Sequence, residues 1–289
     1  MLKKLMFSFL LPGLYSITVL FCGEVYADNT LTVMSWNVES GRADPTVIAE
    51  QIKAFKGVDI WGISEVQNEK WAQMFEQAAE DSEGVDFKSI LGTMGGTNRL
   101  LILYRSDRFD RVERRQLDYI SLGNNWIRPP LIAHLRDTTT GKRFLFMVNH
   151  FMRWERMVRQ IQSRLLNEWG REQTLPVIAV GDFNFDWRIE KEKGNRSFNY
   201  FMKDDVYRWV RPQDMVRTIC SKQRDYDFNQ NDLEEKVCRH NAVLDFVFVS
   251  GPAKDWEATS QVVVREGDFP DSDQTSDHRP VKGTFKLPD

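Results

Sequence analysis

Four apolar segments of the chain each end in polar residues. The clearest is Val177–Val180, which leads through Gly181 to Asp182 and Asn184. Its apolar residues do not alternate with polar ones, which predicts a strand buried on both faces. The other three segments are Val33–Asn37, Ile60–Glu65 and Leu145–His150. We therefore expect several central strands whose ends carry carboxylate, amide and imidazole groups.

Taken alone, Asp182 and Asn184 would indicate a turn after a strand, because Asp and Asn side chains readily bind nearby backbone groups. The same pattern in four segments favours a shared site instead. Ligand sites in α/β folds commonly form where strands end, so these polar groups are candidates for binding and catalysis.

Helical periodicity is found in three segments. Asp44 before Pro45 is typical of a helix start, and Gly57 indicates the end of that helix. A second helix is expected from Asn68 to about Ala79.

The third helical segment has the strongest periodicity in the chain. Its apolar stripe, which we expect to face the core, consists of Trp154, Met157, Val158, Ile161, Leu165 and Trp169. The arginines off this stripe, expected to form a solvent-exposed face, are Arg153, Arg156, Arg159 and Arg164.

The remaining apolar segments predict further strands and a single α/β domain. These strands are Phe87–Leu91, Leu100–Tyr104, Ile127–Leu135, Phe144–Val148, Val243–Val249, Ala258–Val264 and Val281–Phe285. The polar residues 185–240 are expected to be irregular, and no element is assigned to the charged stretch Arg105–Arg115. With no linker or internal repeat, we expect one domain over residues 28–289 with two packed mixed β-sheets flanked by helices, a four-layer α/β sandwich.

The first residues are expected to be an export signal rather than part of this domain. Lys3-Lys4 precedes an apolar run over Leu5–Phe21, and Val25-Tyr26-Ala27 is typical of a signal peptidase site. Residues 1–27 are therefore predicted to be cleaved before Asp28, which implies a secreted or periplasmic, bacterial protein. An uncleaved anchor is the alternative, but the run is short for a membrane span, so no stable membrane insertion is expected.

Composition adds two constraints. After cleavage the chain would carry 37 basic and 41 acidic residues, a net charge of −4. Tight nucleic-acid binding draws largely on phosphate neutralisation, so a nucleic-acid substrate would require local positive charge. Two cysteines would remain, Cys220 and Cys238, which in an exported protein predict a disulfide. Two free thiols are the alternative.

Six short motifs occur in a characteristic order along the chain. They are W-N-V-E, S-E-V-Q, N-H, G-D-F-N, L-D-F-V-F and S-D-H-R-P. In order and rough spacing they resemble the endonuclease/exonuclease/phosphatase superfamily, which includes deoxyribonucleases, abasic-site endonucleases, sphingomyelinases and inositol-polyphosphate phosphatases. The resemblance covers about Leu31 to Leu287 and implies metal-assisted hydrolysis of a phosphate ester.

The resemblance implies a metal site at the ends of these strands. Glu65 resembles the central Mg²⁺ ligand of the superfamily, and Asn37 the asparagine that supports it. Asp277 matches a residue near the metal, and Glu39 a second acidic contact of some members. Because a hard cation needs carboxylate oxygen, Mg²⁺ is the expected cofactor, with Mn²⁺ or Ca²⁺ as alternatives.

The resemblance also implies catalytic roles. Asp182 would orient and deprotonate the attacking water, and Asn184 would hold that water or a phosphate oxygen. His278 resembles the histidine that contacts the scissile phosphate, with Asp245 fixing its tautomer. His150 matches a second phosphate-facing histidine.

Three further residues are candidates for substrate binding. Arg128, in I-R-P-P, resembles a cation that contacts a non-bridging phosphate oxygen. Asn98 and Arg99 occupy the neighbourhood where some deoxyribonucleases carry a glutamate that partners the histidine at the position of His150. Without that glutamate, His150 is expected to be neutral or differently partnered.

The expected function is an exported Mg²⁺-dependent phosphodiesterase that hydrolyses DNA or RNA. The aromatic candidates for base stacking are Trp36, Phe151, Trp154 and Trp187, each of which could instead be a core residue. A phospholipid or sugar-phosphate hydrolase is the alternative; a lipid substrate calls for an exposed apolar hairpin, and the sequence indicates none. A non-catalytic binding protein ranks last because no central residue of the motifs is missing. The oligomeric state stays open.

Overall fold

A computed structural model describes residues 29–220, 242–269 and 274–288 of the chain. The predicted export signal, Cys238 and part of the acidic loop before Ser276 lie outside the described residues. None of the helices in these ranges is long and apolar enough to span a bilayer.

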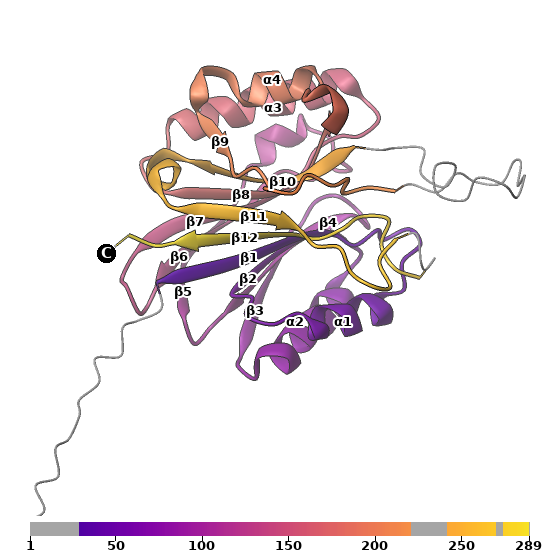
Figure 1. The fold of residues 1–289 in the computed structure, drawn as a ribbon, viewed down its shortest axis with the longest axis vertical. Helices are drawn as coiled ribbons and strands as arrows, with labels where there is room; N and C mark the ends of the chain where they lie inside the picture. Colours follow the sequence, from indigo (N-terminus) through magenta and orange to yellow (C-terminus); the bar gives the residue numbers. More distant parts are fainter. Residues whose placement is uncertain (1–28, 221–241, 270–273, 289) are drawn as a thin grey trace, which may run out of the picture.

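Two six-stranded mixed sheets pack face to face, as the sequence predicted (Figure 1). The first has the order β11-β12-β1-β2-β4-β3 and consists of β1 (Thr30–Asn37), β2 (Ile60–Val66), β3 (Phe87–Leu91), β4 (Arg99–Arg105), β11 (Ala258–Val262) and β12 (Val281–Lys286). The second has the order β5-β6-β7-β8-β10-β9 and consists of β5 (Phe109–Gln116), β6 (Leu131–Asp137), β7 (Arg143–His150), β8 (Val177–Trp187), β9 (Tyr207–Trp209) and β10 (Val243–Ser250).

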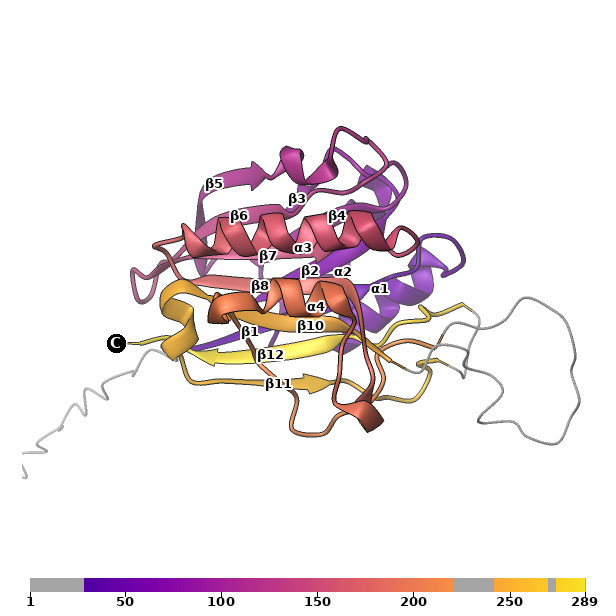
Figure 2. The ribbon, with the colours of Figure 1, turned by 90° about the horizontal axis from the view of Figure 1, so that it is seen from above.

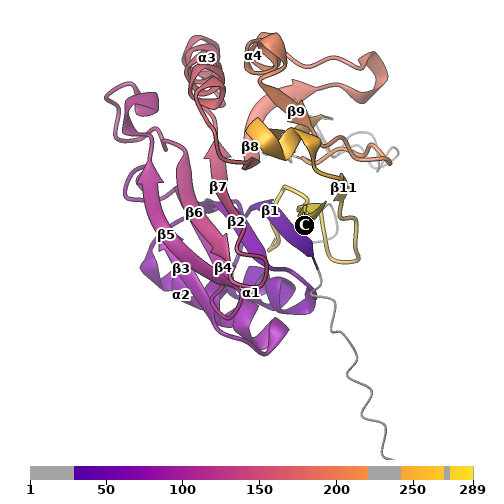
Figure 3. The ribbon, with the colours of Figure 1, turned by 90° about the vertical axis from the view of Figure 1, so that its left-hand side faces the viewer.

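Helices cover the outer face of each sheet, which completes the four layers (Figure 3). Those on the first sheet are α1 (Pro45–Ala54) and α2 (Glu69–Glu83), and those on the second are α3 (Arg156–Arg171) and α4 (Arg196–Phe201). Figure 2 shows α3 and α4 lying across the second sheet. Four short 3₁₀ turns join these elements: η1 (Asp118–Ser121), η2 (Ile189–Lys191), η3 (Lys203–Asp205) and η4 (Gly251–Asp255).

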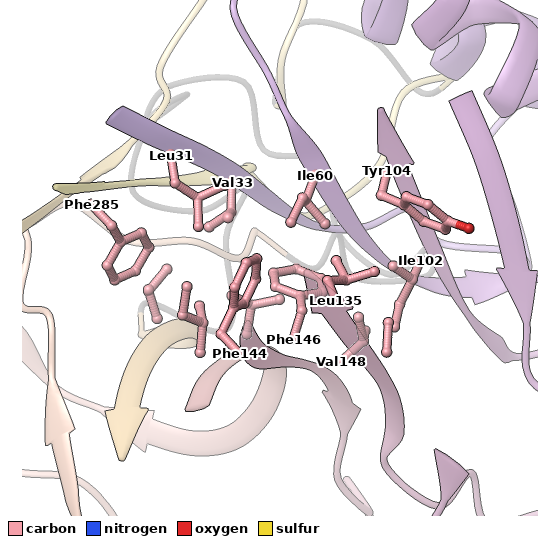
Figure 4. Packing of buried hydrophobic residues seen from close by; sticks show 14 of the residues in the cluster. Leu31, Val33, Ile60, Ile102, Tyr104, Leu135, Phe144, Phe146, Val148 and Phe285 are labelled. Atoms are coloured by element: carbon pink, nitrogen blue, oxygen red, sulfur yellow. The ribbon is translucent and has the colours of Figure 1, made fainter. Parts of the chain in front are cut away.

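The inner faces of the two sheets form the main core (Figure 4). Leu31 and Ile60 of the first sheet are buried in the same cluster as Phe146 and Val180 of the second. At Gly62 in β2 the sheets come so close that an added Cβ would lie 2.5 Å from Cγ2 of Val180. Since real side chains do not approach this closely, the sheets can meet here only because residue 62 has no side chain.

The starts of the first two helices agree with the sequence. The side chain of Asp44 accepts a hydrogen bond from the backbone of Thr46, and Asn68 accepts from Lys70 and Trp71. The predicted end of α2 at Ala79 was too early, because the helix continues until Gly84 adopts a left-handed conformation with φ of 69°.

The predicted core-facing stripe of α3 was wrong over the first half of the helix, although Trp169 near its end is buried as predicted. Trp154 before the helix is 81% exposed, and Met157 and Ile161 also face solvent. The buried face contains five polar residues, Arg159, Gln160, Gln162, Ser163 and Asn167, together with the apolar Leu166 and Trp169. This face donates to backbone carbonyls: Arg159 bonds the carbonyls of Met152 and Arg153, and Asn167 bonds those of Phe201 and Lys203. The helix thus packs against polypeptide loops that need hydrogen-bond donors.

Other elements departed from the predicted boundaries. The charged stretch contains edge strand β5, and the segment predicted to be irregular contains α4 and β9. Strand β6 begins at Leu131, later than predicted, after Pro129 and Pro130. Strand β8 does not end near Asp182 but continues to Trp187, with an irregular register against β10.

Candidate active site

Three neighbouring strands of the second sheet place their polar residues side by side. His150 at the end of β7 pairs with Asp182 of β8, and Asp182 pairs on its other side with Asp245 of β10. All three side chains are buried. Gly181 allows the strands to meet here, because a Cβ at this position would lie 2.0 Å from the carbonyl oxygen of Asn149. The register of the sheet therefore gathers one imidazole and two carboxylates.

The first sheet adds an amide and a carboxylate from its own strand ends. The side-chain amide of Asn37, at the end of β1, donates to Oε1 of Glu65 and to Oδ2 of Asp182, each at 3.1 Å. Asn37 thus joins the two sheets at the cluster, and Glu65 and Asp182 share one hydrogen-bond donor.

Glu65 is held by a segment that the sequence did not single out. Its Oε2 accepts from the backbone N–H of Ser40 at 3.2 Å and lies 3.3 Å from the Ser40 hydroxyl. That hydroxyl also contacts Oδ1 of Asn98, and Gln67 donates to the Ser40 carbonyl at 2.6 Å. Glu65 itself has a φ of 65°, unusual for a residue with a side chain. No motif identified Ser40, because its role depends on contacts between distant segments.

His278 enters the cluster from the loop before β12. Its Nδ1 lies 2.7 Å from Oδ2 of Asp245, and its backbone carbonyl accepts from the indole of Trp36 at 2.9 Å. Burial opposes the charged imidazole, but the carboxylates of Asp245 and Asp277 overcome this and raise the pKa of His278 well above 6.5. Nε2 of His278 lies 3.9 Å from Oδ2 of Asp182.

Burial raises the pKa of two carboxyl groups of the cluster, which favours their protonated form in the absence of a cation. Burial raises the pKa of Asp182 to about 7. Burial and the neighbouring carboxylate of Asp277 raise the pKa of Glu39 to about 7 as well. The backbone N–H of Asp277 donates to Glu39 at 2.9 Å, so these two acidic residues are in direct contact. A bound cation would favour the ionised form of both groups.

These groups surround one cavity of about 240 Å³. It is lined by Asn37, Glu39, Gly41, Arg42, Glu65, His150, Arg153, Asp182, Asp277 and His278. In residues 29–220, 242–269 and 274–288, no three acidic, His or Cys side chains are gathered as a complete metal cage. Mg²⁺ commonly binds one or two carboxylates and fills its other positions with water and phosphate, so the cavity-lining carboxylate of Glu65 fits such an ion.

His150 is buried in this cluster without an acidic partner at hydrogen-bond distance. Its Nε2 lies 3.5 Å from Oδ2 of Asp182 and 3.8 Å from Oε1 of Glu65, while its Nδ1 has no hydrogen-bond partner among the described residues. Burial and the positive charge of Arg128 lower the pKa of His150 well below 6.5. The imidazole is therefore neutral at physiological pH.

The structure separates the three residues predicted to bind substrate. Arg128 is at the cluster. Burial lowers the pKa of its guanidinium, and the nearby carboxylates of Glu65 and Asp182 partly oppose this shift. Asn98 contacts Ser40 behind Glu65. Arg99 is not brought into the cavity, because its guanidinium forms an ion pair with Glu69 at 2.6 Å.

Asn184 is placed beside the cluster rather than in the cavity lining. Its backbone N–H donates to Oδ1 of Asp182 at 2.9 Å, and its side-chain amide donates to the carbonyl of Phe151 at 3.0 Å. In this arrangement Asn184 orients the Asp182 carboxylate. A bond from the backbone N–H of Asn184 to the side chain of Asp182 is typical of a turn that follows a strand. In this protein the bond lies inside β8, which continues to Trp187.

Arg42 and Arg153 line the cavity, although neither was assigned a role at the site. Arg42 lies in a turn with no helical or strand pattern, and Arg153 was expected on the solvent-exposed face of the third helical segment. Among the aromatic residues considered for base stacking, Trp36, Phe151 and Trp187 are buried in the core, so only Trp154 is available. Trp126, which is 71% exposed, was overlooked because a single aromatic residue in a loop has no periodic context.

No curated protein matches the chain. Among solved structures, a mannosyl-6-phosphatase from Bacteroides thetaiotaomicron is 24% identical with a TM-score of 0.63, covering 88% of this chain and 99% of that one. D. rerio TDP2 complexed with a single-strand DNA product is 17% identical with a TM-score of 0.65, covering 89% and 99%. At these identities the similarity establishes the fold.

The family profile extends this similarity to the sequence. The description of the matching family is endonuclease/exonuclease/phosphatase, and the match covers residues 34–278. This range includes five of the six motifs in full, the sixth as far as His278, and every residue that lines the cavity. Members of the family hydrolyse phosphoester bonds and generally use divalent metal ions. The chain therefore belongs to the endonuclease/exonuclease/phosphatase family.

Proposed function

We propose that this protein is an exported, Mg²⁺-dependent phosphodiesterase that hydrolyses nucleic acid strands with an activated water. The observation that carries the proposal is the position of Asp182. It pairs in register with His150 and Asp245 on the neighbouring strands and shares the amide of Asn37 with Glu65 across the two sheets. One carboxylate thus lies between the residues suited to bind a cation and those suited to contact a phosphate.

The side chains divide the work of hydrolysis. Asp182 accepts the proton of the attacking water. The backbone N–H of Asn184 and the side-chain amide of Asn37 each donate to one carboxylate oxygen of Asp182 and so orient this carboxylate. Asp245 binds Nδ1 of His278, which leaves Nε2 to donate a hydrogen bond to the phosphate or the leaving oxygen. Glu65, held by Ser40, would bind the divalent ion. When bound, that ion supplies Lewis-acid stabilisation of negative charge on the phosphate.

A nucleic-acid substrate is supported by charge at the cavity and by one relative. Arg42 and Arg153 line the cavity, and Arg128 is close to its carboxylates, so three arginines stand among the acidic residues where a phosphate would bind. These arginines supply the local cations that a nucleic-acid substrate requires in a chain of negative net charge. TDP2, which shares the fold, was solved with a single-strand DNA product.

A phospholipid or sugar-phosphate hydrolase is the second candidate. The sequence indicated no exposed apolar hairpin, yet Trp154, Met157 and Ile161 form an exposed apolar surface beside the cavity-lining Arg153. This surface is compatible with a lipid substrate. The mannosyl-6-phosphatase relative supports a sugar phosphate, and the cavity of about 240 Å³ has room for a small phosphorylated group.

A panel of substrates decides between these candidates. Plasmid DNA, RNA, sphingomyelin, inositol phosphates and mannose 6-phosphate are incubated with Mg²⁺, Mn²⁺, Ca²⁺ or a chelator. The proposal expects cleavage of DNA or RNA with Mg²⁺ and none with the chelator. Release of phosphate from the sugars alone, or cleavage of sphingomyelin alone, would replace it with the second candidate.

Glu65→Ala tests the metal site itself. We expect at least a hundredfold loss of bis-p-nitrophenyl phosphate hydrolysis, the order of loss seen when a key charge-stabilising group is removed. The matched control is Glu69→Ala, which removes an exposed glutamate that pairs with Arg99. Circular dichroism should show that both variants are folded. Full activity of Glu65→Ala would remove this residue from the metal site.

The export part of the proposal rests on the first residues, which lie outside the described residues. N-terminal sequencing of protein recovered from the periplasm or medium should begin at Asp28; protein retained with its first residues would point to an anchor. Cys220 is buried, whereas Cys238 lies outside the described residues. Non-reducing mass spectrometry should show the two cysteines joined, and two alkylatable thiols would refute the bridge.

A further inference from the structure

Two tryptophans are exposed to an unusual degree. Trp154 is 81% and Trp126 is 71% exposed, the highest values for large apolar side chains among the described residues. Burying a tryptophan removes a large apolar area from water, so exposed tryptophans beside a candidate active site are candidates for binding a substrate.

Both tryptophans lie in segments that adjoin the second sheet at the end where the active site is found. In the antiparallel pair β6–β7, Leu131 lies opposite Val148. Trp126 precedes Leu131 by only a few residues, and Trp154 follows Val148 by a similar number, with His150 on the way. The segments that carry the two indoles therefore extend from adjacent strands beyond the same end of the sheet.

Trp126 is held in place by the loop before β4. Its indole lies against Gly96, where an added Cβ would come within 2.7 Å of Cζ3 of the ring. Its backbone N–H donates to Oδ1 of Asn124 at 2.9 Å. In the same loop, the N–H of Gly95 donates to the carbonyl of Asn125 at 3.0 Å. The ring is thus fixed two residues from Arg128, whose guanidinium is close to the active-site carboxylates.

Trp154 is held by the buried polar face of α3. Arg159 donates to the carbonyls of Met152 at 2.7 Å and Arg153 at 2.6 Å, and Gln162 accepts from the N–H of Met152 at 2.9 Å. These bonds fix the segment just before Trp154. The guanidinium of Arg153, which lines the cavity, lies 4.9 Å from the centre of the Trp154 ring. The indole contacts this cation and is otherwise largely exposed to solvent.

We propose that Trp126 and Trp154 stack against the bases that flank the scissile phosphate of a single-stranded nucleic acid, an inference that rests on the proposed nuclease function. A chain of negative net charge gains little from overall attraction to a polyanion. Stacking supplies affinity without that attraction and accepts any base. Because hydrogen bonds already hold the backbone on which each indole is carried, little backbone entropy is lost when a base binds.

The same surface offers a direct comparison with a lipid. Met157 and Ile161 continue the exposed apolar surface from Trp154 along α3. Bases stack on aromatic rings, so the proposal assigns no part to Met157, whereas a lipid surface would contact aliphatic and aromatic side chains alike. Met157→Ala is therefore the matched control.

Binding is measured without hydrolysis, by fluorescence anisotropy of a labelled oligothymidylate in the presence of a chelator. We expect Trp126→Ala and Trp154→Ala each to weaken binding by about 5- to 150-fold, the loss that accompanies removal of one base–aromatic stack. Trp154→Phe should lose less, because it keeps an aromatic ring. Met157→Ala should bind like the unaltered protein. The three side chains replaced in these four variants are exposed, and thermal unfolding checks that each variant is folded.

Three results would overturn the inference. They are unchanged affinity in both tryptophan-to-alanine variants, absence of oligothymidylate binding by the unaltered protein, and an equal loss in Met157→Ala together with loss of binding to phosphatidylcholine vesicles. The last result would assign the surface to a membrane. The proposed function fails separately, if the unaltered protein hydrolyses neither bis-p-nitrophenyl phosphate nor oligothymidylate with any divalent ion. The binding comparison decides the role of the tryptophans in either case.

Discussion

Nδ1 of His278 lies 2.7 Å from Oδ2 of Asp245, and both side chains are buried. Asp245 is anchored in β10, where its backbone N–H donates to the hydroxyl of Thr218 at 3.1 Å. The pair therefore has little freedom to rotate. Because the carboxylate occupies Nδ1, it is Nε2 that carries the second proton toward the cavity.

The first prediction concerns this pair. Asp245→Asn should lower kcat for bis-p-nitrophenyl phosphate at least tenfold, because an amide neither fixes the tautomer nor supports the charge of His278. It should also move the basic limb of the pH profile to lower pH, since the pKa of His278 falls. Asp137→Asn is the matched control, a buried aspartate that binds Arg108 near the opposite end of β6. A normal pH profile in Asp245→Asn would contradict the assigned role.

The second prediction concerns the stability of the metal-free protein above pH 6.5. The pKa values of Asp182 and Glu39 are raised from 3.8 and 4.5 to about 7, so the folded state holds protons that the unfolded state releases. Their stabilising contribution is complete below the unfolded pKa values and is lost as the pH rises through about 7. The raised pKa of His278 acts in the same direction above 6.5. The lowered pKa of His150 acts oppositely, but only below 6.5.

We therefore expect the free energy of unfolding, measured in urea with a chelator, to decrease between pH 6.5 and pH 8. Mg²⁺ should stabilise the protein more at pH 8 than at pH 6.5, because its binding competes with those protons. Calorimetry in buffers of different ionisation enthalpy should detect proton release on binding at pH 6.5. Metal-free stability that rises over this interval would show that the acidic cluster does not hold protons as described.

The third prediction tests the buried polar face of α3. Arg159→Ala leaves the carbonyls of Met152 and Arg153 without their donor and should lower the free energy of unfolding by about 2–4 kcal/mol, since each buried unsatisfied group costs about 1–3 kcal/mol. The control is Arg164→Ala, whose guanidinium stacks on Tyr200 at the surface and should cost about 1 kcal/mol or less. Urea unfolding measures both. Equal effects would mean that Arg159 is not a structural donor.

The fourth prediction concerns the close contact of β7 and β8. Gly181 has a φ of 135°, and an added Cβ would lie 2.0 Å from the carbonyl oxygen of Asn149. Gly181→Ala must move Asp182, so we expect a loss of more than about 3 kcal/mol of stability and little activity in the folded fraction. Gly57→Ala, also at positive φ but with no atom within 4 Å of the added Cβ, should cost only about 1–2 kcal/mol. Similar unfolding midpoints for the two variants would contradict this account.

The central strands were predictable because consecutive apolar residues indicate a strand that is buried on both faces. Val177–Val180 contains no polar residue, so β8 needed no information from elsewhere in the chain. Edge strand β5 carried no such signal, because only Phe109 at its start is buried and its other residues are in part or fully exposed. The periodicity of the sequence predicted helix α3 but not which of its faces is buried. Periodicity identifies an apolar face, whereas the hydrogen bonds that bury the polar face depend on distant segments.

For the candidate site, the order of the six motifs identified the chemistry but not its geometry. Asn37 and Asp182 share a hydrogen bond although 145 positions separate them. That contact exists because two sheets pack with their strand ends aligned, which no local pattern encodes. The same packing buries Asp182 and raises its pKa, and it brings Ser40, which no motif marks, against Glu65. Local sequence therefore decided which strands form and which reactive groups they carry, whereas distances, protonation and supporting contacts depend on the packing of the two sheets.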